Sequence, residues 1–224
     1  MLLVLSRNIL KLQIISILLL LANSSFFSQQ SKLSKSVNSI RSYIASNHFN
    51  NLKAEIGDLS STDSIYSFAL SECDDNYGDA LLSLMLATVP YREVPIQVPI
   101  INSIWYYPLV SSDEETFLKK NDQLPTQLFF DSPNNKYGDK DKLAHFFGSA
   151  FLSYESNIFD LGNLIGYFVE VFEESFKVQS SVDPRDLDVN YYGRIFGEAL
   201  KENKEILPSQ ILLLRSIRYL RITI

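Results

Sequence analysis

The sequence predicts a mainly α-helical, compact domain. Apolar residues recur at helical spacing in several segments along the chain, and this period is typical of helices that bury one face. In the C-terminal half, three segments also place glycines and polar residues at shared helical offsets, which predicts a core in which the glycine faces of three helices meet. A proline-rich segment before them predicts an extended strap lying over the helices.

The first 28 residues have the pattern of a secretory signal peptide. Arg7 and Lys11 make the start basic, the run from Leu12 to Ala22 is mostly apolar, and small polar residues follow. The apolar run is shorter than the roughly 20 residues that a bilayer crossing needs. We therefore predict export, with residues 1–28 as the signal peptide. An uncleaved N-terminal anchor is the alternative.

Composition narrows the range of partners. The formal net charge is −6, and an acidic chain is unsuited to nucleic acid, which requires a basic face. The single cysteine, Cys73, allows no internal disulfide, and the acidic residues around it disfavour a reactive thiolate. An oxidising compartment is therefore compatible with the chain, although no disulfide makes use of it.

Residues 29–135 are predicted to form an N-terminal helical region. Apolar residues at helical spacing favour a first helix over residues 37–59, for which Gly57 is a stop signal. Further helices are expected over residues 63–71 and 78–89, and a proline follows the last of them.

The second half of this region differs from the first in composition, because it is uncharged and rich in proline over a long segment. The segment Val94–Ser112 carries no charge but contains three prolines, so we expect it to be extended rather than membrane-spanning. Asp113 then begins either an acidic helix or a loop. Residues 124–135 favour a short strand and a turn.

Residues 136–224 are predicted to form the helical core, and the three glycine-bearing segments lie here. Within each segment the helical offsets place the polar residues and glycines on one face. The sets are Asp141, His145 and Gly148; then Gly162, Gly166, Glu170 and Glu173; then Asp186, Asn190, Gly193 and Gly197.

Repeated glycines on polar helix faces need a compensating gain, because glycine within a helix costs about 1 kcal/mol relative to alanine. A close approach of helix backbones supplies that gain. We therefore expect the three helices to meet and to bring a polar cluster together. Its candidate members are Asp141, Lys142, His145, Glu170, Glu173, Asp186 and Asn190.

Three interpretations of this cluster are open. The first is a structural polar network, with Asp183 as the N-cap before Pro184 and Asp186 completing the capping arrangement. The second is a general acid–base pair of His145 with Glu170. The third is a divalent metal site. Its ligands would be His145, Glu170, Glu173 and Asp186.

The cluster resembles the signature of VanZ-like and YfiM-like envelope proteins. The matching pattern is Asp141-Lys142-x-x-His145-Phe146, then Glu170-x-x-Glu173, then Arg185-Asp186-x-x-x-Asn190-x-x-Gly193-x-x-x-Gly197. The resemblance covers only residues 139–199. It implies a cell-envelope location, and it implies no particular substrate.

Two departures favour the exported YfiM-like type within this resemblance. VanZ-like proteins have glutamine where this chain has Glu173, and the YfiM-like set has an acidic residue there. VanZ-like proteins are also integral membrane proteins, whereas the charge-free run around Phe147 extends only from Leu143 to Tyr154.

The C-terminal segment predicts a last helix over residues 209–219, opened by Pro208. Arg215, Arg218 and Arg221 recur every three residues and give an acidic chain a basic end. This helix is expected either to dock on the core with solvated arginines, or to touch a membrane surface through anionic lipid headgroups.

Together, these patterns predict an exported cell-envelope protein, in the periplasm or peripheral to a membrane, whose polar cluster is structural or binds a small ligand. The alternative is a metal-dependent hydrolase acting on an envelope lipid or glycan. The sequence leaves open whether the protein is an enzyme.

Overall fold

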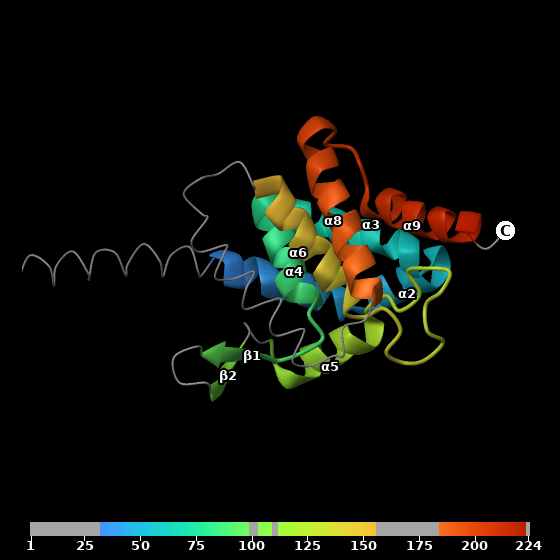
Figure 1. Ribbon diagram of the computed structural model, residues 1–224. Helices are drawn as coiled ribbons and strands as arrows, with labels where there is room; N and C mark the ends of the chain where they lie inside the picture. Colours follow the sequence, from blue (N-terminus) through green and yellow to red (C-terminus); the bar gives the residue numbers. More distant parts are fainter. Residues whose placement is uncertain (1–31, 99–102, 109–111, 156–183, 223–224) are drawn as a thin grey trace, which may run out of the picture. The chain divides into compact units, whose positions relative to one another are not determined.

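The computed structural model describes residues 32–98, 103–108, 112–155 and 184–222. The chain divides into two compact units, Met1–Lys35 and Ser36–Ile224, and the fold described below is that of the second. In the described residues the unit is mainly α-helical, as predicted, and it also contains a pair of antiparallel strands (Figure 1). Residues 36–44 are helical. The labelled elements are α2 (Asn47–Ile56), α3 (Asp58–Glu72), α4 (Tyr77–Thr88), β1 (Glu93–Val98), β2 (Ser103–Pro108), α5 (Glu114–Gln123), α6 (Lys142–Glu155), α8 (Pro184–Glu202) and α9 (Pro208–Ile222).

The single helix predicted over residues 37–59 is wrong, because the chain turns twice within it. A turn at residues 45–46 precedes α2, and the Ser46 hydroxyl caps that helix by accepting the Phe49 backbone N–H at 3.1 Å. Gly57, with a φ of 82°, then separates α2 from α3. Apolar residues recur at helical spacing on both sides of each break, so the period alone predicts one helix. The breaks come from the capping serine, Ser46, and from Gly57.

Helix α4 is buried on nearly every face, and three side chains, of which Arg41 and Lys120 are buried, donate to carbonyl groups at and just after its C-terminal end. Carbonyl groups at a helix end have no partner within the helix, and cations there are favoured by the helix dipole. The bonds are Arg41 Nη2 to Leu86 O at 2.9 Å, Lys120 Nζ to Val89 O at 2.7 Å and Asn121 Nδ2 to Pro90 O at 3.0 Å.

The described parts of the charge-free segment, residues 94–98 and 103–108, are extended, as predicted, and they belong to two paired antiparallel strands rather than to a single strap. Glu93 on β1 is opposite Pro108 on β2, and Val98 is opposite Ser103. Pro95 is accommodated within β1, and a hairpin of two strands is tolerant of proline because each strand is an edge.

Helices α6 and α8 lie side by side (Figure 1) and approach closely at two glycines of α8. A β-carbon added at Gly193 would lie 2.3 Å from the Phe146 carbonyl oxygen, and one at Gly197 would lie 2.3 Å from that of Ala150. No larger side chain fits at these separations, so the predicted close approach is confirmed at the glycines of α8, which contact Phe146 and Ala150 of α6. The second of the three predicted segments, with Gly162 and Gly166, lies outside the described residues.

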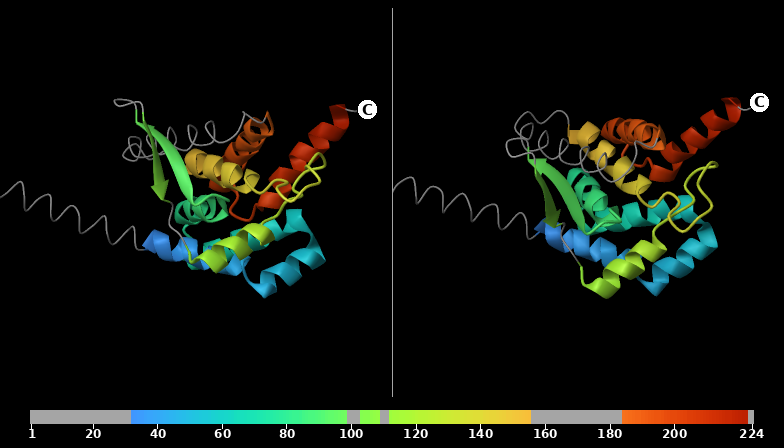
Figure 2. Two further views of the ribbon diagram at one scale, coloured as in Figure 1. Left: turned by 90° about the horizontal axis from the view of Figure 1, so that it is seen from below. Right: turned by 60° about the horizontal axis from the view of Figure 1, so that its bottom comes forward.

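Helix α9 packs against α3 and α8 (Figure 2). Asp63 on α3 accepts the Ser209 backbone N–H at 2.8 Å and its hydroxyl at 2.5 Å, and Ile211 and Leu212 are buried. The predicted last helix is therefore present and docked on the core. Of the helices in the described ranges, none combines the length and the hydropathy of a membrane span.

Candidate functional site

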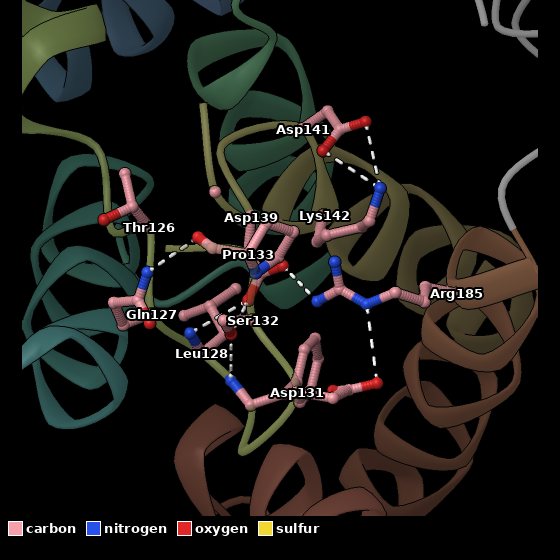
Figure 3. A network of polar contacts seen from close by, with 12 residues as sticks. Thr126, Gln127, Leu128, Asp131, Ser132, Pro133, Asp139, Asp141, Lys142 and Arg185 are labelled. Carbon is pink, nitrogen blue, oxygen red and sulfur yellow. Dashed lines mark hydrogen bonds and ion pairs between the residues drawn. The ribbon is translucent and has the colours of Figure 1, made fainter. Parts of the chain in front are cut away.

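A buried carboxylate, Asp139, organises the loop that leads into α6. Its Oδ2 atom accepts the Leu128 backbone N–H at 3.0 Å and the Ser132 hydroxyl, and its Oδ1 atom pairs with the Arg185 guanidinium from α8 (Figure 3). The strand predicted within residues 124–135 is wrong, because this stretch is a loop whose backbone bonds to side chains. The loop thereby sets the start of α6 against the start of α8.

A second carboxylate, Asp131, ties the same loop to α9. Arg215 binds it in bidentate fashion, with Nη1 to Oδ1 at 2.5 Å and Nη2 to Oδ2 at 2.9 Å. The Arg215 guanidinium also lies over the Phe129 ring, 4.4 Å from its centroid. Arg215 is buried and is therefore not part of the exposed basic end that the sequence predicted. Arg218 is exposed, and the side chain of Arg221 lies outside the described part.

Lys142 lies at the centre of the polar cluster. Its ammonium is 2.6 Å from Asp186 Oδ1 and 3.2 Å from each carboxylate oxygen of Asp141. Lys142 and Asp186 are both buried, whereas Asp141 is partly exposed. The positive charge of Lys142 therefore compensates two negative charges, that of Asp186 on α8 and that of Asp141, which directly precedes α6.

His145 joins the same cluster one helical turn further on. Its Nε2 atom is 3.7 Å from Asp186 Oδ1, and its Nδ1 atom is 3.3 Å from Asn190 Oδ1. The Ser149 hydroxyl donates to the same Asn190 oxygen at 3.0 Å. Since that oxygen can only accept, the Nδ1 atom of His145 carries a hydrogen in this contact.

The surroundings lower the pKa of His145 and raise the pKa of Lys142. Burial lowers the pKa of His145, and Asp186 and Asp141 only partly offset this effect. Burial also disfavours the Lys142 ammonium, but the carboxylates of Asp141 and Asp186 outweigh it and raise the pKa of that lysine. At neutral pH the cluster therefore holds a charged lysine and a neutral histidine.

Three groups of the cluster could present ligand atoms to a metal ion. One atom each from Asp141, His145 and Asp186 lies within 4.8 Å of the others, and oxygen and imidazole nitrogen suit Zn²⁺ or Mn²⁺. However, the Lys142 ammonium already lies against both carboxylates. These residues fit a metal ion only if Lys142 moves away.

The predicted cluster is thus assembled in part. The structure places Asp141, Lys142, His145, Asp186 and Asn190 together: Lys142 pairs with Asp141 and Asp186, and His145 lies against Asp186 and Asn190. The Oδ1 atom of Asp186 pairs with Lys142 between the helices. The capping role considered for Asp186 involves Asp183, which lies outside the described residues. Glu170 and Glu173, and with them the acid–base pair of His145 with Glu170, also lie outside that part of the chain.

Sequence reasoning missed two neighbours of the cluster. Ser149 follows His145 by four residues, so the same offset argument could have included it. Tyr91 lies between α4 and β1, and its pKa is raised by burial and by the charge of Asp141. No helical offset could connect Tyr91 to the cluster, because only the tertiary fold brings it near.

The fold and the site define a class of helical protein in which a charge-compensated polar cluster lies at a glycine-packed helix pair. Comparison of the chain with models of protein families, with characterised proteins and with solved structures finds no match to any of them.

Proposed function

We propose that the protein is an exported, non-catalytic component of the cell envelope, periplasmic or membrane-peripheral, in which the polar cluster clamps α6 to α8. Residues 1–28 support export, because they have the pattern of a signal peptide. The cell-envelope location is supported by the resemblance of the motif around Lys142 and Asp186 to VanZ-like and YfiM-like proteins.

The observation that carries the clamp is the position of the Lys142 ammonium between two carboxylates. A metal ion or a cationic substrate at this cluster would have to compete with that ammonium for the carboxylates of Asp141 and Asp186. Here the internal cation lies against the carboxylates, and the neutral His145 donates to Asn190. Charges that are satisfied within the protein contribute to packing specificity more than to chemistry.

Two measurements test this proposal. Alkaline phosphatase fused after Ile224 is expected to be active in cells, since the enzyme folds only after export, and an inactive fusion would contradict export. Elemental analysis of protein purified without a histidine tag is expected to find no stoichiometric metal. A stoichiometric metal that the Asp186→Asn variant loses would contradict the clamp.

A second candidate function is a metal-dependent hydrolase acting on an envelope lipid or glycan. The ligand atoms of Asp141, His145 and Asp186 within 4.8 Å of one another favour it. A divalent ion would have to displace Lys142, so added Zn²⁺ should raise the melting temperature more in Lys142→Met than in the natural protein. The absence of any shift in both proteins would remove this candidate.

A further inference from the structure

Helix α9 presents a fixed apolar face to solvent. Its exposed fractions are 46% for Leu213, 45% for Leu214 and 53% for Ile217. Large apolar side chains exposed singly are ordinary, but a group of them on one helix marks an interaction surface. The face therefore calls for a partner with an apolar region.

This face does not depend on a loosely attached helix. Asp63 holds the first turn of α9 through Ser209, and Asp131 holds its middle through the bidentate contact with Arg215. Because Ile211, Leu212 and Arg215 are buried, the rotation of α9 about its own axis is set by the core. The orientation of Leu213, Leu214 and Ile217 is thus built into the fold.

The exposed charge next to this face is positive. The segment from residue 208 to residue 224 contains no acidic residue. Of its three arginines, Arg215 is buried and neutralised by Asp131, and the side chain of Arg221 lies outside the described part. Arg218 is exposed next to Ile217. A surface that combines exposed leucine and isoleucine with arginine is complementary to an interface that is anionic at its edge and apolar below it.

We propose that the α9 face formed by Leu213, Leu214, Ile217 and Arg218 docks on the surface of a lipid bilayer that contains anionic lipids. This inference rests on the proposed cell-envelope location and specifies how the protein would be held there. The apolar side chains would enter the headgroup region while Arg218 contacts lipid phosphates.

The test uses a fluorophore that reports directly on α9. The full chain carries one cysteine, Cys73, which is buried, so a Leu213→Cys variant can be labelled selectively with an environment-sensitive dye. Phosphatidylcholine vesicles containing phosphatidylglycerol should shift its emission to the blue, and pure phosphatidylcholine vesicles should not. Arg218→Gln should weaken the apparent affinity about fivefold, and adding Ile217→Asp should abolish the shift.

Matched controls distinguish binding through this surface from non-specific binding of the protein to vesicles. Leu118 on α5 is as exposed as Ile217, at 53%, so a dye at Leu118→Cys should report no shift. Arg194→Gln, an exposed arginine on α8, should leave the Leu213→Cys signal unchanged.

An equal shift with neutral vesicles would overturn the proposal, and so would a concentration-dependent shift without vesicles, which would indicate docking of a second copy. An inactive phosphatase fusion combined with normal vesicle binding would overturn export and leave this surface intact. The reverse result would remove the surface alone.

Discussion

Lys142 on α6 and Asp186 on α8 form a buried ion pair, with 2.6 Å between Nζ and Oδ1. The pair lies at the first turns of the two helices, and further along the same helix pair Gly193 and Gly197 bring the α8 backbone against Phe146 and Ala150. The glycines allow the backbones to approach, and the ion pair selects one alignment of the two helices. The glycine contacts and the Lys142–Asp186 ion pair therefore stabilise the same pair of helices, α6 and α8.

Replacing Lys142 with methionine should destabilise the protein by about 3–5 kcal/mol, because Asp186 would be left buried without its cation. Urea unfolding measures this loss. The double variant Lys142→Met, Asp186→Leu should recover most of it, since an apolar pair needs no compensation. Lys119→Met breaks an exposed pair with Glu115 and should cost at most about 1 kcal/mol. Equal costs for the two lysine variants would contradict the clamp.

Gly193→Ala should be destabilising even though alanine favours helix. The added β-carbon would lie 2.3 Å from the Phe146 carbonyl oxygen, and backbone cannot move aside cheaply. We expect a loss of about 1–3 kcal/mol in thermal or urea unfolding, as for other overpacked sites. The neighbouring variant Arg194→Ala, at an exposed position of the same helix, should change stability little. A stabilised Gly193→Ala protein would show that α6 and α8 are further apart than described.

Acid should weaken the fold through His145. Burial lowers its pKa in the folded protein, whereas the unfolded chain takes up this proton near the ordinary histidine pKa of about 6.5. Below that pH the unfolded state binds more protons, so the free energy of unfolding falls as pH drops towards the folded pKa. His145→Gln should flatten the stability profile in this window. His48→Gln, at an exposed position, serves as the control, and a profile unchanged by His145→Gln would refute the assignment.

Asp139→Asn should loosen the loop before α6. The buried carboxylate accepts the Leu128 N–H and the Ser132 hydroxyl and pairs with Arg185. Its loss removes one of the two carboxylates beside the half-buried Arg185 guanidinium, since Asp131 stays 3.6 Å from Arg185 Nε, and it weakens the buried bonds to the loop, so we expect a cost of about 1–3 kcal/mol. Hydrogen exchange of residues 124–141 should accelerate relative to α4. Asp122→Asn, an exposed change on α5, should leave exchange unaltered. Unchanged protection of the loop in Asp139→Asn would mean that the carboxylate does not organise it.

Much of the fold class follows from local signals in the sequence. The helical period located α4 and α9 to within a few residues, because burial of one helix face requires that period. The offset of Asp141, His145, Asp186 and Asn190 relative to the glycines likewise predicted that their faces converge. The same method failed at Ser46 and in residues 124–135, where side-chain bonds to the backbone end or replace regular structure.

The sequence by itself determined which helix faces are glycine-lined and polar, since helix geometry fixes which residues share a face. Only the tertiary structure decided what those polar groups do. It placed the Lys142 ammonium between Asp141 and Asp186, at the position that one of the three interpretations gave to a metal ion, and it buried Arg215 against Asp131 instead of exposing it. Which charged groups pair depends on their distance in space and on their desolvation, and the spacing of residues along the chain determines neither.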